Sequence, residues 1–280
     1  MEKNDRLLVR KSTGDMEPFS AEKVTNSLKR AGASEELISE IAGELDTVLY
    51  DGISTAKLYK QVYTLLRKKQ TATAARYRLK KAIMDLGPTG YPFEFFVGEI
   101  IRRRGFEVEI GQVLEGRCVS HEVDVVATGK GKRYFIECKY YNSQGKYADV
   151  KVALYIHSRV NDLVAKQSNL PGTEDFQFGG WIVTNTRFTS DAIAYGECSG
   201  LELLSWDYPG NGGLKDIAGR EKLYPVTALS TLSGKHKKNL IREGIVICQQ
   251  LHDRPQLLDA LEPDPERRKK VLNEVAGLCK

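Results

Sequence analysis

The chain lacks the segments that would place it across a membrane. No stretch of its 280 residues approaches about 18 consecutive apolar residues, the length at which a membrane-spanning helix is suspected. The first residues, MEKNDRLLVRK, are charged where a signal peptide carries an apolar run, so no export signal is expected. The Walker-type pattern G-x-x-x-x-G-K-[ST] is also absent, which excludes a P-loop nucleotide hydrolase.

Cysteine and histidine are too few and too scattered for a disulfide framework or a zinc site. No metal-ligand spacing occurs at His157, His236 or His252. An odd number of dispersed cysteines without any C-x-x-C pair is typical of reduced thiols, so the sequence predicts a cytoplasmic protein. The five cysteines are Cys118, Cys138, Cys198, Cys248 and Cys279.

What the chain does have is length, charge and an ordinary globular composition. At 280 residues it is long enough for two or three domains, each with its own core. Its 41% hydrophobic and 28% charged content is usual for a folded domain. The formal net charge of +5 and the pI near 8.8 allow a polyanion as partner without demanding one.

The most informative stretch is a predicted pair of strands at residues 121–140. The first, HEVDVVA, alternates so that Val123, Val125 and Ala127 lie on one face and Asp124 lies on the other. After a turn that carries glycine and lysine, the second strand, RYFIECKY, returns. Its period of two puts Glu137 and Lys139 on the same face.

These side chains predict a metal site. Asp124 and Glu137 repel each other unless a cation lies between them, and oxygen ligands suit Mg²⁺ or Mn²⁺. Beside such a metal, Lys139 can activate water or neutralise charge on a phosphate, which phosphodiester hydrolysis requires. Upstream, FEFFVGEIIRRR predicts a helix from which Glu99 can reach the same metal. His121 can contact DNA or metal, but a polar residue at a strand entrance is more often structural.

Together these residues resemble the PD-(D/E)XK nuclease superfamily, and in detail its Mrr-type restriction endonuclease branch. The shared pattern is a helix acid, a strand ending at Asp124, twelve further residues and then Glu137-x-Lys139. Residues 179–207 resemble the later strand, helix and strand of that branch. The resemblance implies a catalytic set of Glu99, Asp124, Glu137 and Lys139, with Asp124 and Glu137 holding the metal. Val123 stands where many members carry proline.

The rest of this region alternates between helix and strand. Residues 149–167 predict a helix whose Lys151, Arg159 and Lys166 can face a phosphate backbone, although such charges are more commonly solvated. A buried strand at 181–185, a helix at 190–200 and a last strand at 201–206 follow. This alternation predicts an α/β core.

The N-terminal region, residues 6–85, predicts a small β-hairpin and four helices, with Ser20, Ser34 and Ser54 as N-caps and a fourth helix at 71–86. It resembles the ATP-cone, the nucleotide-sensing domain of ribonucleotide reductases and of the regulators of their genes. The matching residues are Val9-x-Lys11-x-x-Gly14-x-x-Glu17-Pro18-Phe19-Ser20-x-x-Lys23-Val24, Gly52-Ile53-Ser54-Thr55 and Ala74-Ala75-Arg76-Tyr77.

That resemblance implies ATP or dATP as an effector. Its contacts would be Lys11, Glu17, Ser20, Lys23, Thr55 and one of Lys80 or Lys81. A glycine- and lysine-bearing turn beside a helix N-terminus also suits a phosphate on physical grounds. Ser12-Thr13 replaces the basic and acidic pair that usually follows the lysine. The alternative is a helical domain with a solvated basic face.

The last region is predicted to be helical. A joint of a few residues, GPTGYP, precedes the α/β core, and the glycine-rich residues 209–219 mark its end. Residues 226–280 resemble a helix-hairpin-helix DNA-binding module through their leucine spacing and Ser233-Gly234-Lys235. The resemblance implies phosphate contacts from Gly234, Lys235, Lys237, Lys238 and Arg242. A helical bundle for protein contacts is the alternative.

The expected architecture is therefore multi-domain: an α-helical ATP-cone with a small β-hairpin (5–87), an α/β PD-(D/E)XK core with a mixed sheet (91–209) and a C-terminal all-α bundle (224–280). The expected activity is metal-dependent cleavage of double-stranded DNA, regulated by an adenine nucleotide. A nucleotide-responsive DNA-binding regulator with an inactive nuclease scaffold is the alternative. Two cuts in a duplex need two active sites, which favours a homodimer.

Overall fold

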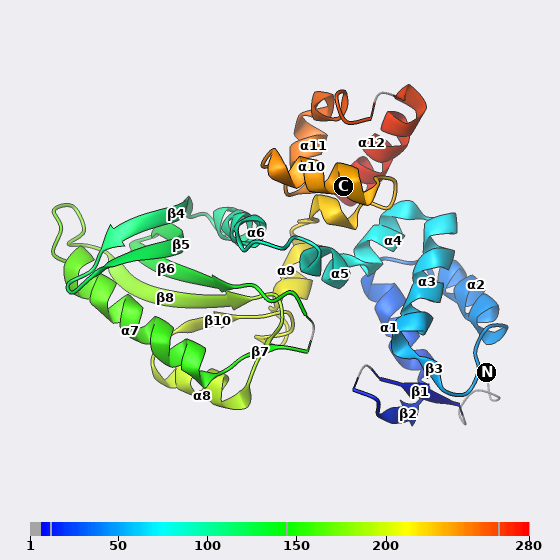
Figure 1. The fold of residues 1–280 in the computed structure, drawn as a ribbon, viewed down its shortest axis with the longest axis horizontal. Helices are drawn as coiled ribbons and strands as arrows, with labels where there is room; N and C mark the ends of the chain where they lie inside the picture. Colours follow the sequence, from blue (N-terminus) through cyan, green and yellow to red (C-terminus); the bar gives the residue numbers. More distant parts are fainter. Residues whose placement is uncertain (1–6, 12, 144, 263, 280) are drawn as a thin grey trace.

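The computed structural model describes residues 7–11, 13–143, 145–262 and 264–279. Asp5, Arg6, Ser12 and Lys280, which fall within the predicted domains, lie outside these residues. Figure 1 shows an N-terminal unit, a central sheet flanked by helices, and a helical C-terminal segment that lies beside both. We use these three names below for residues 7–86, 91–207 and 208–279. No helix of the described residues is long and apolar enough to cross a membrane.

The N-terminal unit begins with a small sheet and three capped helices. Strand β1 (Leu8–Arg10) pairs antiparallel with β2 (Met16–Pro18) and parallel with β3 (Ile53–Ser54), so a third strand joins the predicted hairpin. The helices α1 (Ala21–Arg30), α2 (Glu35–Asp46) and α3 (Thr55–Lys69) start where predicted. Ser20, Ser34 and Ser54 each accept a backbone N–H three residues on, as N-caps do.

The predicted fourth helix, residues 71–86, is divided in two. Helix α4 (Thr71–Tyr77) ends at Arg78, and α5 (Leu79–Met84) follows it. Helix α4 packs on α3 and on the last helix of the C-terminal segment, whereas α5 packs on the start of that segment, so the two pieces follow different surfaces. Arg78 stabilises the break, because its Nη2 donates to Asp85 Oδ2 at 2.8 Å beyond the end of α5.

The central sheet is mixed, as expected. Its order is β10-β8-β6-β5-β4, and the strands are β4 (Glu107–Glu115), β5 (Ser120–Gly129), β6 (Lys132–Lys139), β8 (Gln177–Thr184) and β10 (Glu202–Leu204). The pairs β4–β5 and β5–β6 are antiparallel, and β6–β8 and β8–β10 are parallel. A separate parallel pair joins β7 (Tyr147–Ala148) to β9 (Arg187–Phe188).

Helices cover both faces of this sheet. Helix α6 (Tyr91–Arg103) packs with Val125, Ala127 and Ile136 on one face. Helices α7 (Val150–Gln167) and α8 (Ser190–Cys198) pack with Val126 and Phe135 on the other. Consecutive residues of β5 thus face opposite layers, which is the period of two that the sequence shows.

Val123 departs from that alternation and corrects the prediction. It packs with Val126 and Phe135, not with Val125 and Ala127. The β5–β6 ladder ends at Val125–Ile136, while β5 stays paired with β4 as far as Ser120. In β4, Gly111 at φ +65 lies opposite Asp124 and allows a local twist. Released from β6, the start of β5 therefore turns with β4, and the side chains change layers.

The C-terminal segment consists of α9 (Leu214–Arg220), η1 (Val226–Ala228), α10 (Gly234–Arg242), α11 (Cys248–Asp253), η2 (Pro255–Leu258) and α12 (Pro265–Cys279). The predicted glycine-rich boundary at 209–219 contains most of α9. Leu214, Ile217 and Ala218 have helical spacing and are buried, so this stretch is part of the core. Before Ser233 the chain forms η1 and a non-helical stretch, so no α-helix directly precedes the predicted hairpin.

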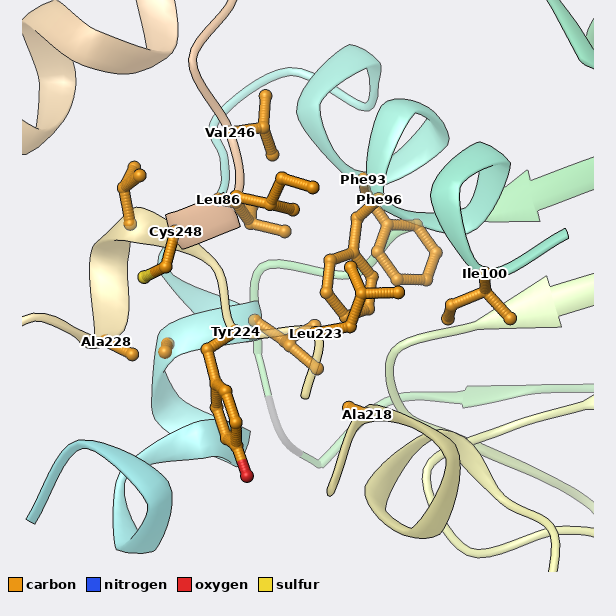
Figure 2. Close-up of a cluster of buried hydrophobic side chains, with 14 of the residues drawn as sticks. Leu86, Phe93, Phe96, Ile100, Ala218, Leu223, Tyr224, Ala228, Val246 and Cys248 are labelled. Atoms are coloured by element: carbon orange, nitrogen blue, oxygen red, sulfur yellow. The ribbon is translucent and has the colours of Figure 1, made fainter. Parts of the chain in front are cut away.

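One apolar cluster joins the three parts of the molecule. Figure 2 shows Phe93, Phe96 and Ile100 of α6 beside Leu223, Tyr224, Val246 and Cys248 of the C-terminal segment, with Leu86 from the end of the N-terminal unit. We call this cluster the shared core. The C-terminal helices are therefore not an isolated bundle.

Polar contacts reinforce the same junctions. The Tyr140 hydroxyl donates to the Met84 carbonyl at 2.7 Å and accepts the Gly87 N–H at 2.8 Å, which fixes the joint to the end of β6. In α12, Gly277 faces α4 so closely that an added Cβ would lie 3.0 Å from the Cβ of Ala72. Arg76 of α4 donates to the Gly277 carbonyl. The N-terminal unit is thus held against both other parts.

Truncation of the shared core should destabilise all three parts together. Phe93 is fully buried, so Phe93→Ala should lower the free energy of unfolding by about 3–5 kcal/mol. Urea unfolding followed by circular dichroism and by tryptophan fluorescence measures this. Tyr91→Ala is the matched control, because Tyr91 lies on the same helix and is 54% exposed. If the urea midpoint measured by circular dichroism were the same in Phe93→Ala and the wild type, part of the chain would unfold independently of the shared core.

Candidate active site and nucleotide-binding corner

The candidate active site forms where β5 and β6 separate. Val125 and Ile136 are the last paired residues, and the next positions are Asp124 and Glu137. Asp124 Oδ2 accepts the backbone N–H of Cys138 at 2.7 Å, so a side chain replaces the missing ladder bond. The separation leaves two carboxylates side by side at the ends of neighbouring strands. This is the pairing that the sequence predicts.

Glu137 holds two cationic side chains. Lys139 Nζ lies 2.6 Å from Glu137 Oε1, and Arg159 Nη1 of α7 lies 2.7 Å from Oε2. The first distance confirms that Glu137 and Lys139 point the same way. Arg159 also donates to the Glu122 carbonyl, and its side chain is 15% exposed. Arg159 therefore faces the site and is not a solvated charge, while its contact with a phosphate backbone stays a prediction.

Glu94 of α6 joins the two strand carboxylates. Burial, followed by the charges of Asp124, Glu122 and Glu137, raises the pKa of Glu94 to about 7. Burial, followed by the charge of Glu137, raises the pKa of Asp124 to about 6, although the Cys138 N–H, Lys139 and Arg159 oppose that shift. Each acid thus feels negative charge that the neighbouring cations do not neutralise.

The structure puts Glu94, and not Glu99, in this cluster. Glu99 pairs with Arg102 one turn along α6, and Arg102 Nη2 donates to the Val108 carbonyl of β4. Val108 pairs with Ala127, three residues along β5 from Asp124, a separation of about 10 Å at strand spacing. The prediction of Glu99 is wrong because five residues of helix turn a side chain by about 140°, onto another face.

The sequence carries a signal for the choice between these two acids. An added Cβ at Gly98 would lie 3.2 Å from Ile110 Cδ1 and 3.3 Å from Val108 Cγ1 of β4. The glycine therefore marks where α6 approaches β4, and Glu99 follows it directly. Glu94 lies nearer the start of the helix, between the buried Phe93 and Phe96. Arg159 has no comparable signal, because its partner is distant in sequence.

The donor chemistry of this cluster fits a hard divalent cation. Burial is the largest cause of the raised pKa values of Glu94 and Asp124, and the charge of Glu137 adds to both, so a cation beside these carboxylates would favour their ionised forms. Among the described residues, no group of three or more His, Cys, Asp or Glu side chains is already arranged to hold an ion. The two oxygens of Glu137 each contact a cationic side chain. A metal would share those oxygens with Lys139 and Arg159.

His121 is anchored elsewhere. Its Nε2 lies 2.8 Å from Asp162 Oδ2 of α7, and Asp162 Oδ1 accepts the Cys118 N–H at 2.9 Å. The hydrogen bond to His121 lowers the pKa of Asp162 to about 2. These bonds tie the β4–β5 turn to α7, so His121 has the structural role that its position favours.

Five of the residues predicted for the nucleotide gather at one corner of the N-terminal unit. Lys11 Nζ lies 2.7 Å and Lys23 Nζ lies 3.6 Å from Glu17 Oε2. The hydrogen bond between Lys11 and Glu17 raises the pKa of Lys11 and lowers the pKa of Glu17. Ser20 caps α1 through the Lys23 N–H, and Thr55 starts α3 directly after Ser54, which pairs with Arg10. We call these five residues the nucleotide corner.

The two remaining predicted nucleotide contacts have other partners. Lys80 Nζ lies 5.5 Å from the ring centroid of Trp206, and burial, followed by the charge of Arg187, lowers the Lys80 pKa. Lys81 Nζ lies 2.8 Å from Asp85 Oδ1. These lysines have other partners because the predicted fourth helix is divided at Arg78, so α5, which carries both lysines, runs along a different surface from α4.

The residues predicted for DNA contact all lie on α10. Gly234, Lys235, Lys238 and Arg242 are exposed. Lys237 is 9% exposed, and its Nζ donates to the Thr227 carbonyl at 3.1 Å. Lys237 is therefore wrong as a DNA contact, because it faces inward toward the N-terminal unit.

Comparisons with known proteins match all three parts. Family models match an ATP cone domain at residues 7–84, a restriction endonuclease at 88–207, and an AF1548-like C-terminal region at 224–279. An uncharacterized protein of Archaeoglobus fulgidus is 33% identical over 155 residues, which are 55% of this chain and 83% of that protein.

Two solved structures are similar to different degrees. The protein of unknown function AF1548 has a TM-score of 0.55 at 29% identity, over 68% of this chain and 98% of that chain. The MspJI restriction endonuclease, in complex with a 27-mer oligonucleotide, has a TM-score of 0.36 at 13% identity, over 61% of this chain and 36% of that chain. The second likeness is too low to establish a common fold. The chain belongs to the family of its Archaeoglobus relative, and its matched regions are those of an Mrr-like restriction endonuclease domain with an N-terminal ATP cone domain and an AF1548-like C-terminal region.

Proposed function

We propose that this protein is a metal-dependent endonuclease that cuts double-stranded DNA and is regulated by ATP or dATP. The observation that carries the proposal is the cluster of Glu94, Asp124 and Glu137 beside Lys139, where β5 and β6 separate. Acids with unneutralised charge destabilise a fold, so the presence of Glu94 and Asp124 beside the paired Glu137 and a lysine favours a binding and catalytic role. We divide the chain at 5–87, 91–209 and 224–280, and we place the protein in the cytoplasm.

The side chains have separable roles in hydrolysis. Asp124 and Glu137, with Glu94 in place of Glu99, would hold Mg²⁺ or Mn²⁺, which when bound polarises a phosphoryl oxygen and acidifies water. Lys139 orients the attacking water through its ammonium N–H groups and offsets the negative charge that develops on the phosphate. Arg159 holds the Glu137 carboxylate in place from α7. Of the residues on α10, Lys235, Lys238 and Arg242 are available to the DNA backbone.

One observation favours the alternative, a nucleotide-responsive DNA-binding regulator. Both oxygens of Glu137 contact cationic side chains, so the protein itself already neutralises one of the three acids. A scaffold that only binds DNA can keep such ion pairs permanently. The raised pKa values of Glu94 and Asp124 favour the enzyme, because a finished ion-pair network would leave no such excess of negative charge. A homodimer would place two such sites on one duplex.

The nuclease proposal predicts metal-dependent nicking. Supercoiled plasmid should be nicked with Mg²⁺ or Mn²⁺ and not with EDTA, and Asp124→Asn or Lys139→Gln should lower the rate by about 100-fold or more. Glu94→Gln should lower it by at least about tenfold. Glu99→Gln is the matched control on the same helix and should retain the wild-type rate.

Gel separation of nicked and supercoiled plasmid distinguishes the outcomes. If Asp124→Asn and Lys139→Gln both cut normally, the site is assigned to the wrong residues. If no metal supports nicking while the wild type still binds DNA and responds to ATP, the protein is the regulator described above.

The charged cluster also predicts a pH-dependent stability. The folded-state pKa values of Asp124 (about 6) and Glu94 (about 7) lie above the ordinary values of about 3.9 and 4.3, so ionising them costs stability. That cost is absent below about pH 4 and complete above pH 7. Asp124→Asn should therefore raise the melting temperature at pH 8 by about 2–4 °C and change it less at pH 5.

Differential scanning fluorimetry at the two pH values measures these melting temperatures. Mn²⁺ should stabilise the wild type at pH 8 and have a smaller effect on Asp124→Asn, which gives a readout independent of cleavage. Equal destabilisation of Asp124→Asn at both pH values would contradict the proposed repulsion.

The nucleotide corner predicts ATP binding that depends on its lysines. Lys11→Gln or Lys23→Gln should weaken ATP binding by about tenfold, because each removes one charge-assisted contact to phosphate. Isothermal titration calorimetry measures the affinity, and the plasmid assay with and without ATP measures regulation. Lys29→Gln is a control on the same helix, since Lys29 pairs with Glu35 instead. Unchanged ATP affinity in both corner variants would place the nucleotide elsewhere.

A further inference from the structure

A cavity of about 610 Å³ lies between the N-terminal unit and the C-terminal segment. Residues of α3, the end of α5, the joint and α10 line it, and Ser230 lies in the stretch before α10. This volume is in the range of small-molecule sites. It is separate from the nucleotide corner and from the acid cluster, since it includes none of their residues.

Positive charge dominates this cavity. Arg67, Arg78, Lys237 and Lys238 line it, and the one carboxylate among the lining residues is Asp85. Asp85 is already paired, at 2.8 Å, with both Arg78 and Lys81. Three of the cationic side chains therefore converge on a space that holds no free acid among its described lining residues.

The start of α10 adds to that charge. Ser233 caps the helix, and the first turn contains Gly234, Lys235 and no acidic residue. A helix N-terminus carries partial positive charge and favours an anion. One carboxylate is already near this turn, since Glu262 Oε2 lies 3.7 Å from His236 Nδ1, but Glu262 does not line the cavity. Gly234 lines the cavity, so the helix end faces it.

Two buried polar side chains line the cavity as well. Ser230 is 8% exposed, and its Oγ has no hydrogen-bond partner among the described residues. Lys237 is 9% exposed, and its ammonium group has one acceptor, the Thr227 carbonyl. Burial, with the charge of Arg78 as a second cause, lowers the Lys237 pKa to about 8. Both residues can donate further hydrogen bonds.

The loop that presents Ser230 is held rigidly. Glu274 of α12 is 1% exposed and accepts the N–H groups of Ser230 at 2.7 Å and Thr231 at 2.9 Å. The Thr231 hydroxyl donates to the same carboxylate at 2.6 Å. Because this buried carboxylate fixes the backbone, the cavity wall is preformed.

We propose that this cavity binds the phosphate groups of a small phosphorylated molecule, held by Arg67, Lys237, Lys238 and the N-terminus of α10. A planar, forked guanidinium and flexible ammonium groups are the side chains that recognise phosphate. The site lies between two parts of the protein rather than on a convex surface, which suits a small ligand better than a DNA backbone. The inference does not rest on the proposed nuclease activity.

The test uses the full chain with Lys11→Gln and Lys23→Gln, which removes the nucleotide corner. Inorganic pyrophosphate is titrated calorimetrically and should still bind. Adding Arg67→Gln should weaken binding by about tenfold, whereas Lys68→Gln should not, because Lys68 is the neighbouring exposed residue and does not line the cavity. Lys237→Met keeps the side-chain volume and should also weaken binding about tenfold. Circular dichroism confirms that each variant is folded.

Proton uptake provides a second readout. Binding a phosphate at pH 8 should protonate Lys237, so the measured heat should depend on the ionisation enthalpy of the buffer, and this dependence should be smaller in Lys237→Met. Titration with ATP and with adenosine identifies what is recognised. ATP binding without adenosine binding supports phosphate recognition. The proposal is overturned if pyrophosphate and ATP do not bind the corner variant, if adenosine alone binds, or if Arg67→Gln and Lys68→Gln act equally.

Discussion

The packing of α6 in the shared core determines how the rest of the molecule is arranged. Phe93, Phe96 and Ile100 are fully buried between the sheet and the C-terminal segment, and Glu94 lies between the first two. The same apolar contacts that join the three parts therefore also position an acid of the candidate site. Because protein cores are packed at close to crystal density, α6 cannot shift without moving its neighbours. The position of Glu94 is thus tied to the end of the N-terminal unit, which contributes Leu86 to the same cluster.

The candidate site contains more acidic than basic side chains, and the separation of strands β5 and β6 makes room for them. A regular ladder would pair the backbones at Asp124 and Glu137, but it stops at Val125–Ile136, and the Asp124 carboxylate takes the Cys138 N–H. Three acids then share the space with Lys139 and Arg159, and burial strengthens the repulsion that those two cations leave unrelieved. Glu137 carries both cations, whereas Glu94 and Asp124 carry the excess negative charge. The acids of this cluster are therefore not equivalent.

Local patterns in the sequence gave correct predictions where one element determines the result. The caps Ser20, Ser34 and Ser54 and the shared direction of Glu137 and Lys139 are of this kind, whereas the mixed sheet was expected from the family resemblance. The errors arise where contacts with a second helix or strand determine the direction of a side chain or the end of a helix. Val123 changes layers because β5 has left β6 at that point and stays paired with β4, and Glu99 is displaced by Glu94 because of how α6 crosses β4. The fourth helix divides because α5 packs on η1, which is about 145 residues away in the sequence. Periodicity within one segment contains none of this information.

The nucleotide corner is connected to the central sheet by side chains in contact, with no flexible linker between them. One turn after Thr55, Tyr59 of α3 stacks on Tyr77 with ring centroids 5.0 Å apart, and Tyr77 ends α4. Lys80, in the next turn of chain, lies over Trp206 beyond the last strand of the sheet. A ligand shifts a conformational equilibrium only if it binds one conformation more tightly than the other. A nucleotide at the corner would therefore affect Trp206 only if the stacked Tyr59 and Tyr77 rings had two alternative packings with different nucleotide affinities. At the break, α4 and α5 contact different elements of the C-terminal segment, α12 and η1. An ATP cone domain joined to the central sheet by a few residues has this direct contact, which a long tether would remove.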